Sequence, residues 1–358
     1  MARPARPRLP LVAAFAALAV SVSVAGCGGD ASTATPAAST KASAAPVTVR
    51  LGYFPNLTHA TAIVGVEDGL FAKALKGNHL KTQTFNAGPE ATQALLSGAI
   101  DATYIGPGPS TNAYAKSGGQ AVRIVSGATS GGAALVVKRS IKSPKDLKGK
   151  KIASPQLGNT QDIALRYWLK QRGFATTQEG GGDVKVFPQD NSQTVDTFGT
   201  GAIDGAWVPE PTLSRLVNDG GKVLVDERSL WPGGKFVTTN LLVSKSFLDK
   251  HPDVVKELIE GQVAANKAVN ADPAHAQAVV AAAIGKLTGK PLKASLVAQA
   301  WKTLSFTNDP LPATLLSGAQ HATAVGLLKK VDKLSGIYDL HLLNEVLSAA
   351  GESPVAQP

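Results

Sequence analysis

Cysteine is almost missing from this 358-residue sequence, which contains only Cys27. One cysteine excludes an intrachain disulfide framework and any zinc site built from several cysteines. The six histidines are scattered, and no two of them stand four residues apart, as a metal-binding helix would require. No motif of a zinc protease, a serine hydrolase or a P-loop protein occurs in a supporting context. The sequence therefore predicts no metal and no other cofactor, and it favours a protein that is not an enzyme.

Long apolar runs are scarce as well, and the single one opens the chain. Residues 9–26 carry no charge and follow Arg3, Arg6 and Arg8, an order typical of a secretory signal peptide. A run of this length is also sufficient for one membrane-spanning helix. The run ends in Val-Ala-Gly-Cys at 24–27, which resembles the bacterial lipobox. We therefore expect 1–26 to be a lipoprotein signal peptide. Cys27 would then be lipidated and would anchor the protein to the extracytoplasmic face of the cell membrane.

The segment that follows Cys27 has few residues able to form a core. Residues 27–46 are rich in alanine, serine and threonine and contain two prolines. Such a composition buries too little apolar surface to offset the entropy of ordering the chain. We expect 27–46 to be a flexible tether between the anchor and a globular body.

Acidic residues are outnumbered, but not by enough to indicate a nucleic-acid partner. The chain has 36 Lys and Arg residues against 26 Asp and Glu residues, a formal net charge of +10. Three arginines belong to the predicted signal peptide, which leaves 33 basic and 26 acidic residues, or +7, in the mature chain. This excess is spread along the body without a basic run, so nucleic acid is not an expected partner.

From residue 47 the sequence alternates between strand and helix patterns, and it does so twice. The first half predicts strands at 47–53, 81–85 and within 99–106, with helices through 63–66 and 89–96. The second half predicts strands at 150–154, 184–187 and within 201–208, with helices through 164–168 and 194–198. The tetrapeptide Gly-Ala-Ile-Asp stands in the same place in both halves, at 98–101 and 201–204. This order predicts an α/β protein in which each half is a mostly parallel sheet flanked by helices.

The two halves predict two lobes joined by two chain crossings. We assign 47–130 together with 240–358 to lobe 1, and 131–239 to lobe 2. Residues from 243 onward form a mostly helical supplement, in which Asp272 and Pro273 begin an alanine-rich helix. Small residues at 126–132 and 236–240 suit either hinge strands that absorb a closing rotation or ordinary turns.

Ligands of such sheets bind beyond the carboxyl ends of the strands, where helix N-termini point. Four loops there contain small, hydroxyl-bearing and amide residues, which serve either as helix caps or as ligand contacts. The candidate ligand-binding residues in these loops are Asn56, Thr58, His59, Gly106, Pro107, Gly108, Ser110, Asn159, Thr160, Trp207 and Glu210.

Three of these candidates have a sharper chemical interpretation. Glu210 would select an ammonium or hydroxyl group of the ligand, or else it is an acid at the start of a helix. Trp207 would pack on an alkyl or ring portion, or else it is a core aromatic. His59 would donate to an anion, or else it is an ordinary exposed residue at the start of a helix. The four loops contain no Arg or Lys, which argues against a purely anionic solute such as nitrate.

Four segments together carry a resemblance to a known family: 51–71, 86–114, 154–174 and 201–217. They resemble the substrate-binding lipoproteins of ABC importers in the sulfonate, nitrate, taurine and thiamine-precursor (SsuA/THI5-like) group. The resemblance extends from 47 to about 328. It implies a two-lobed type II periplasmic-binding-protein fold that closes on a small solute. It also implies delivery to a membrane permease driven by a separate ATPase.

The expected function is therefore that of a monomeric, extracytoplasmic solute-binding component of an ABC importer. Its expected solute is a small organic anion, namely an aliphatic sulfonate or a taurine-like compound. Alternatives within the class are a thiamine-precursor pyrimidine and nitrate. A biosynthetic enzyme of the pyrimidine-synthase type is the alternative of another class, but the cysteine-rich motif of those enzymes is missing here. A regulator with the same fold would need a DNA-binding helix-turn-helix, whereas the N-terminus carries a signal.

Overall fold

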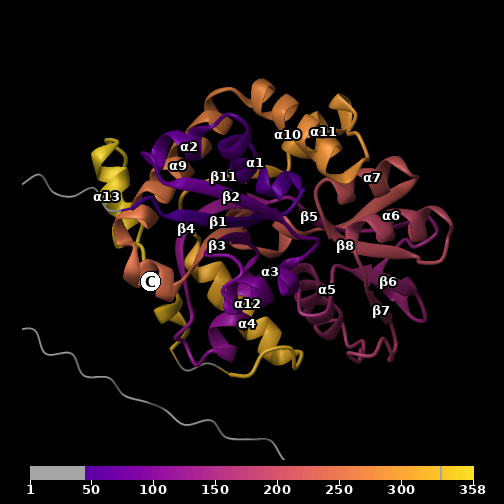
Figure 1. The fold of residues 1–358 in the computed structure, drawn as a ribbon. Coiled ribbons are helices and arrows are strands. Elements are labelled where there is room, and N and C mark those ends of the chain that lie inside the picture. The colour runs from indigo at the N-terminus through magenta and orange to yellow at the C-terminus, as the bar shows by residue number, and fades with distance from the viewer. Residues whose placement is uncertain (1–44, 331–332) are drawn as a thin grey trace, which may run out of the picture. The chain divides into compact units, whose positions relative to one another are not determined.

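The chain folds around two β-sheets, each flanked by helices (Figure 1). The structure, a computed structural model, describes residues 45–330 and 333–358. We call the part built on the six-stranded sheet lobe 1 and the part built on the five-stranded sheet lobe 2. The predicted signal peptide, Cys27 and nearly all of the predicted tether lie outside the described residues. In the described part of the chain, no helix has both the length and the apolar character to cross a membrane.

The sheet of lobe 1 has the order β11-β4-β10-β3-β1-β2. Its strands are β1 Thr48–Tyr53, β2 His79–Thr84, β3 Ala102–Ile105, β4 Val122–Gly131, β10 Val237–Ser244 and β11 Leu304–Phe306. Strand β1 is parallel to β2 and β3, whereas β10 is antiparallel to β3 and β4, and β11 is antiparallel to β4. The sheet is therefore mixed.

The sheet of lobe 2 has the order β7-β6-β8-β5-β9. Its strands are β5 Ala133–Lys138, β6 Lys151–Ser154, β7 Lys185–Pro188, β8 Gly205–Pro209 and β9 Gly221–Asp226. Strand β6 is parallel to β7 and β8, and β5 is antiparallel to β8 and β9. In both sheets the strands of the repeated β-α units are parallel, as predicted. Strands β5 and β10, which follow the two chain crossings, run antiparallel to them.

Helices cover the faces of both sheets. In lobe 1 they are α1 Ala60–Glu67, α2 Leu70–Ala74, α3 Gly88–Leu96, α4 Pro107–Lys116, α8 Lys245–Lys250, α9 Pro252–Ala271 and α10 Pro273–Thr288. In lobe 2 they are α5 Thr160–Lys170, α6 Asn191–Gly199 and α7 Thr212–Asn218. The C-terminal region adds α11 Ala294–Trp301, α12 Pro312–Ala324 and α13 His341–Ala349. Of these, α11 packs on α10 of lobe 1 and on α7 of lobe 2, and α12 packs on α4 of lobe 1 and on α5 of lobe 2, so the supplement contacts both lobes (Figure 1).

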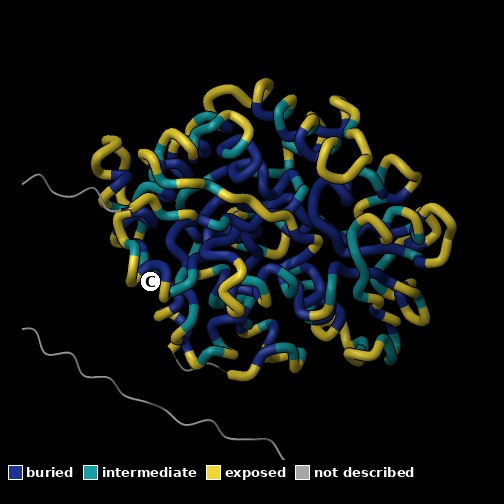
Figure 2. Tube along the Cα trace, viewed as in Figure 1, coloured by how far each residue is buried: buried dark blue, intermediate teal, exposed yellow. Residues whose placement is uncertain are grey.

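The central strands of both sheets are buried on both faces, as their dark colour in Figure 2 shows, whereas the edge strand β2 is largely exposed. In lobe 2, Ala134 and Val136 of β5 belong to one apolar cluster, whereas Leu135 and Val137 belong to another on the opposite face. Alternate residues of a strand point to opposite faces, so a strand that is covered twice must be apolar at every position. The near-continuous Ala, Leu and Val of β5 follow from this.

The repeated Gly-Ala-Ile-Asp segments do the same structural work in the two lobes. Asp101 accepts hydrogen bonds from the backbone N–H and the guanidinium of Arg50, which belongs to β1. Asp204 accepts one from the backbone N–H of Lys151, the first residue of β6. Gly98 and Gly201 both have a positive φ, of 74° and 80°, which glycine adopts without steric cost. The internal repeat is therefore a repeat of structure, and it fixes the start of β3 against β1 in lobe 1 and the start of β8 against β6 in lobe 2.

The chain crosses between the sheets at two places. Strand β4 of lobe 1 ends at Gly131 and β5 of lobe 2 begins at Ala133, and the return lies between β9 and β10. The predicted hinge segments fall on β4 and β10, which pair antiparallel with each other from Val237 opposite Ser130 onward. The sequence left open whether these segments are strands or turns, and in the structure they are strands. The lobe boundaries at 130–131 and 239–240 stay predictions.

One local prediction is wrong. The Gly-Pro-Gly-Pro segment at 106–109 was expected to be a loop ahead of a helix, but α4 begins at Pro107 with Gly106 as its N-cap. Proline fits the first turn of a helix because the N–H that it lacks has no partner inside the helix there. The first turn of α4 therefore lies in the cleft itself.

Candidate functional site

The first turns of two helices from different lobes meet at the carboxyl ends of the strands. Gly108 of α4 donates its backbone N–H to Oγ1 of Thr160, the first residue of α5, at 3.3 Å. A methyl group on Gly106 would lie 2.3 Å from the same Oγ1, well inside contact distance. Glycine at 106 thus permits a close approach of the two lobes that alanine would prevent.

A small inner cavity lies beside this contact. Six of the predicted residues line it: Asn56, Thr58, His59, Gly106, Asn159 and Thr160. Asn86, Gln161 and Asn191 add further amide groups, and none of the lining side chains is a Lys, Arg, Asp or Glu. The volume is about 20 Å³, enough for about one water molecule. The lobes must therefore separate before an organic solute can enter.

His59 faces the inner cavity as a neutral side chain. Its ring stacks on Phe54 with centroids 4.4 Å apart, and its Nδ1 accepts the backbone N–H of Phe54 at 3.3 Å. Burial lowers the pKa of His59 to about 3, because an imidazolium would lose its hydration there. The alternative of an exposed histidine at a helix start is wrong, since only 3% of the His59 surface is accessible. A neutral His59 with Nδ1 engaged carries its proton on Nε2, the nitrogen that can donate to a ligand.

Local hydrogen bonds in α4 and α5 engage two of the remaining candidates. Asn159 is the N-cap of α5, and its side chain accepts the N–H of Thr160 at 2.9 Å. Ser110 is completely buried in α4 and donates its hydroxyl to the carbonyl of Gly106. Asn159 still lines the inner cavity, whereas the hydroxyl proton of Ser110 is already used. Pro107 and Gly108 face a separate small cavity beside Trp231 and His321.

Glu210 occupies the position of a helix-start acid. Its Oε2 accepts the backbone N–H of Ser214 in α7 at 3.0 Å, and its Oε1 accepts the hydroxyl of Ser214 at 2.9 Å. The side chain is completely buried. Burial raises the pKa of Glu210 to about 7, although the bonds from Ser214 oppose the rise. Both carboxylate oxygens are therefore engaged within lobe 2 in this conformation.

Trp207 occupies the position of a core aromatic. Along β8 its neighbours Ala206 and Val208 belong to the cluster against α7, so Trp207 points to the opposite face and packs edge-on against Trp168 of α5. Its indole N–H donates to Oε2 of Glu227 at 2.7 Å, and both side chains are buried. Because alternate residues of a strand point to opposite faces, Trp207 faces Trp168 and not the cleft, whereas Ala206 and Val208 face α7.

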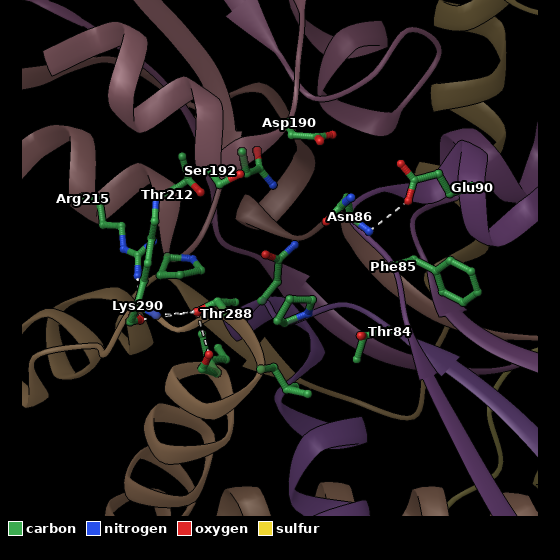
Figure 3. Close-up of a pocket in the computed structure, with 16 residues that line it drawn as sticks. Thr84, Phe85, Asn86, Glu90, Asp190, Ser192, Thr212, Arg215, Thr288 and Lys290 are labelled. Carbon is green, nitrogen blue, oxygen red and sulfur yellow. Dashed lines mark hydrogen bonds between the residues drawn. The ribbon is translucent and has the colours of Figure 1, made fainter. Parts of the chain in front are cut away.

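A larger chamber opens outward from the inner cavity. Its volume is about 380 Å³, and it shares Asn56, Asn86 and Asn191 with the inner cavity. Figure 3 shows Arg215 and Lys290 together at one side, Glu90 at the other, and Asp190 between them at the edge. We call this space the outer chamber. It provides the cleft with four charged groups, in contrast to the uncharged inner cavity.

The four charged residues of the outer chamber were missed by the sequence analysis. Glu90 and Asp190 follow β2 and β7, the second parallel strand of each lobe, whereas the predicted candidates follow the first and third strands. Their place after a parallel strand is the sequence signal that identifies them. Arg215 lies on the second turn of α7 and Lys290 follows α10. The four predicted loops contain no Arg or Lys, but residues outside them supply both to the outer chamber.

Comparisons with known proteins agree with this architecture. The family profile of the NMT1-like family matches residues 42–285. The taurine-binding periplasmic protein of Escherichia coli K12 is 31% identical over 212 residues, which cover 59% of this chain and 64% of that protein. The chain thus matches somewhat less than two thirds of that relative's length.

Solved structures share the fold at low sequence identity. The alkanesulfonate-binding protein SsuA from Xanthomonas axonopodis pv. citri, bound to MOPS, has a TM-score of 0.68 at 20% identity and covers 82% of this chain and 99% of its own. The periplasmic nitrate-binding protein NrtA from Synechocystis PCC 6803 has a TM-score of 0.71 at 16% identity, with coverages of 85% and 89%. The predicted two-lobed fold is confirmed, and the chain belongs to the NMT1-like family.

Proposed function

We propose that this protein is the extracytoplasmic solute-binding component of an ABC importer. It captures a small organic anion, an aliphatic sulfonate or a taurine-like compound, between its lobes and delivers it to a permease. It acts without catalysis and without a cofactor. The observation that carries the proposal is the meeting of the first turns of α4 and α5, from opposite lobes, beside a cavity lined by amide and hydroxyl groups.

Binding would couple to closure through these same helices. Free N–H groups at helix N-termini favour anions, and a solute that contacts both lobes stabilises the closed form over the open one. The similarity to proteins that bind taurine, alkanesulfonate and nitrate supports a small anionic solute.

Calorimetric titration of the full-length protein tests the binding function. The probes are taurine, ethanesulfonate, nitrate and a hydroxymethylpyrimidine. We expect a single site for at least one sulfonate, with a matching rise in melting temperature. Preference for nitrate or the pyrimidine would identify one of the two alternative solutes. No heat and no thermal shift with any of the four would contradict a solute-binding function.

Anchoring is a separate part of the proposal. Cys27, at the end of the lipobox-like segment, would carry the lipid and hold the body near its permease. Replacing Cys27 with alanine should move the protein from the membrane fraction to the medium and abolish labelling by a radioactive fatty acid. Unchanged labelling of the variant would contradict lipidation at this residue.

A further inference from the structure

The end of the lobe 2 sheet that lies opposite to the cleft is strongly basic. The cleft is at the carboxyl ends of the parallel strands β6, β7 and β8, so the opposite end holds their first residues. Because β5 is antiparallel to β8 and β9, its last residue and the first residues of β9 lie at that end as well. Nine basic residues are gathered there: the seven Lys and Arg residues within 138–151, Lys185 and Lys222. We call these nine residues the basic face.

The strand pairing brings the basic residues side by side. Lys151 at the start of β6 is paired with Lys185 at the start of β7. Lys222 of β9 is paired with Val137, the neighbour of Lys138 at the end of β5. Neighbouring strands lie about 4.8 Å apart, so lysines from four of the five strands share one sheet edge about 20 Å wide. The segment 139–150 begins and ends at the same edge, because it joins β5 to β6.

The segment 139–150 presents its lysines from an ordered backbone. Ile141 and Leu147 are buried in the core of lobe 2. Between them, Ser143 and Asp146 form a capping box around the short 3-10 helix Pro144–Leu147. The side chains left exposed beside these anchors are those of Lys142, Lys145 and Lys148. The positive charges of this segment are therefore held at the surface by the fold.

The protein leaves most of this charge unneutralised. Four acidic residues lie in or beside the same segments, Asp146, Asp183, Asp204 and Asp219, so the nine basic residues leave a net charge of +5. The predicted mature chain has +7 in total. The positive excess is thus concentrated at this end, and the expectation that it is spread along the body is wrong.

Ion pairs hardly reduce this charge. In the part of the chain that the structure describes, Lys138 is the one member of the basic face with a carboxylate at ion-pair distance, that of Asp204 at 3.6 Å. Asp183 and Asp146 instead accept backbone N–H groups, from Ala175 and Ser143 respectively. These carboxylates serve the local fold, so the lysine ammonium groups are available to an external anion.

The chemistry of the basic face suits a broad anionic surface. Eight of its nine residues are Lys, which is depleted in protein–protein interfaces, whereas aromatic residues and Arg are enriched there. No large apolar side chain within 138–151 is exposed, and no residue of the basic face lines the inner cavity or the outer chamber. Clustered lysines without a pocket are attracted to the surface charge of anionic lipids.

We propose that the basic face docks lobe 2 on an anionic phospholipid membrane. The inference rests on the proposed function, in which an anchor at Cys27 holds the body near that membrane. The 20 residues of 27–46 span at most about 70 Å when extended. A body of this size is about 50 Å across, so the basic face can reach the lipid surface. Because the basic face is at the opposite end of the strands from the cleft, the contact leaves the solute path open.

Co-sedimentation with lipid vesicles tests this contact. The full-length chain carries Cys27→Ala, so that no attached lipid contributes to binding. The probes are vesicles of phosphatidylcholine alone and vesicles in which about one third of it is replaced by phosphatidylglycerol. We expect about tenfold or more tighter partitioning to the anionic vesicles at about 0.1 M salt, and loss of the difference at about 1 M salt, where the Debye length is about 3 Å. Equal partitioning at the lower salt would overturn the inference.

Charge variants locate the contact on the protein. Four members of the basic face make no side-chain hydrogen bond or ion pair within the described residues, so the fold should persist when they are replaced together by glutamine: Lys142, Lys145, Lys148 and Lys185. We expect this variant to partition about tenfold or more weakly to the anionic vesicles, since each lysine near such a surface adds several-fold to binding.

A matched variant controls for net charge. It replaces four exposed lysines of lobe 1 by glutamine: Lys73, Lys81, Lys250 and Lys286. This variant should keep most of its partitioning to anionic vesicles. An equal loss in both variants would mean that net charge alone governs binding, and it would overturn the assignment to the basic face.

Two further measurements separate the possible outcomes. Taurine titration of the basic-face variant should match that of the unmodified protein, because its four residues do not line the inner cavity or the outer chamber. If solute binds and anionic vesicles do not, the solute-binding function stands and the membrane contact fails. If vesicles bind and no solute does, the reverse holds. The same affinity for a DNA duplex as for anionic vesicles would identify a general polyanion surface and overturn the assignment to a membrane.

Discussion

The backbone N–H of Gly108 in lobe 1 donates to Oγ1 of Thr160 in lobe 2 at 3.3 Å, so two helix N-termini from opposite lobes touch in this conformation. The inner cavity beside them holds about one water molecule. The contact therefore belongs to a closed form. In this form the first turns of α4 and α5 approach closely because Gly106 and Gly108 have no side chains that would clash. Closure depends on the absence of side chains at these two positions.

Gly106→Ala should prevent full closure. The added methyl group would lie 2.3 Å from Thr160 Oγ1, and the φ of −76° at Gly106 is acceptable to alanine, so the fold should persist. We expect solute affinity to fall by about tenfold or more, because overpacking of this kind costs roughly 1–3 kcal/mol. Calorimetry measures the affinity, and small-angle scattering with solute measures the radius of gyration.

Two further variants make this test specific. Adding Thr160→Ala removes the clashing atom and should restore part of the affinity. Gly199→Ala places its methyl group in open space and should leave binding unchanged. Normal affinity and normal compaction in Gly106→Ala would show that the contact plays no part in closure.

Glu227→Gln should alter the pH dependence of stability. Burial raises the pKa of Glu227 from 4.5 to about 7, so the folded chain holds this proton at a pH where the unfolded chain has released it. The contribution of this group to the free energy of unfolding is therefore lost as pH rises from about 4.5 to about 7. Glutamine keeps an acceptor for Trp207 without the charge. Relative to the wild type, the variant should gain on the order of 3 kcal/mol between pH 4.5 and pH 8.

Urea denaturation of both proteins at the two pH values gives this difference directly. Glu210, whose pKa burial also raises to about 7, is present in both proteins and cancels in the comparison. Parallel stability curves for the variant and the wild type would rule out a buried, titrating Glu227.

Trp207→Phe should separate a structural role from a ligand contact. The substitution keeps an aromatic ring but removes the donor that Glu227 accepts at 2.7 Å. Leaving a buried acceptor unpaired costs about 1–3 kcal/mol, so the free energy of unfolding should fall by that amount. The dissociation constant of the solute should stay the same. A loss of affinity without a loss of stability would instead restore Trp207 to the binding site.

His59 should remain neutral through the physiological range. Burial lowers its pKa to about 3, and its imidazole should therefore show no titration by nuclear magnetic resonance between about pH 8 and pH 5. The folded chain resists a proton that the unfolded chain accepts, so this residue lowers the free energy of unfolding as pH falls from 6.5 towards 3. A His59 resonance with a midpoint near pH 6 would mean that the side chain is hydrated, contrary to the packing against Phe54.

Sequence patterns were sufficient for the α/β architecture, the internal repeat and the strand ends that form the cleft. These features arise from short-range causes: alternation along a strand, caps at a helix start, and a glycine with positive φ three residues before Asp101 and Asp204 in the two halves. Helix α4 begins at Pro107, earlier than the sequence predicts. Proline usually indicates a loop, but the first turn of a helix also accepts it.

The sequence patterns did not predict the direction in which individual side chains point. Trp207 and Glu210 stand at a predicted strand end, yet one packs against Trp168 and the other accepts hydrogen bonds from Ser214. A strand of this kind is buried on both faces, and an apolar run does not reveal which residues face which layer.

The repeated β-α order of the sequence determined by itself the two-lobed α/β architecture, and it predicted a site at the strand ends. Only the tertiary structure decided the electrostatics of that site. Glu90, Asp190, Arg215 and Lys290 come from separate segments of the chain and meet at one chamber. Their proximity results from the packing of two lobes and a C-terminal supplement, and local sequence patterns carry no information on such long-range contacts.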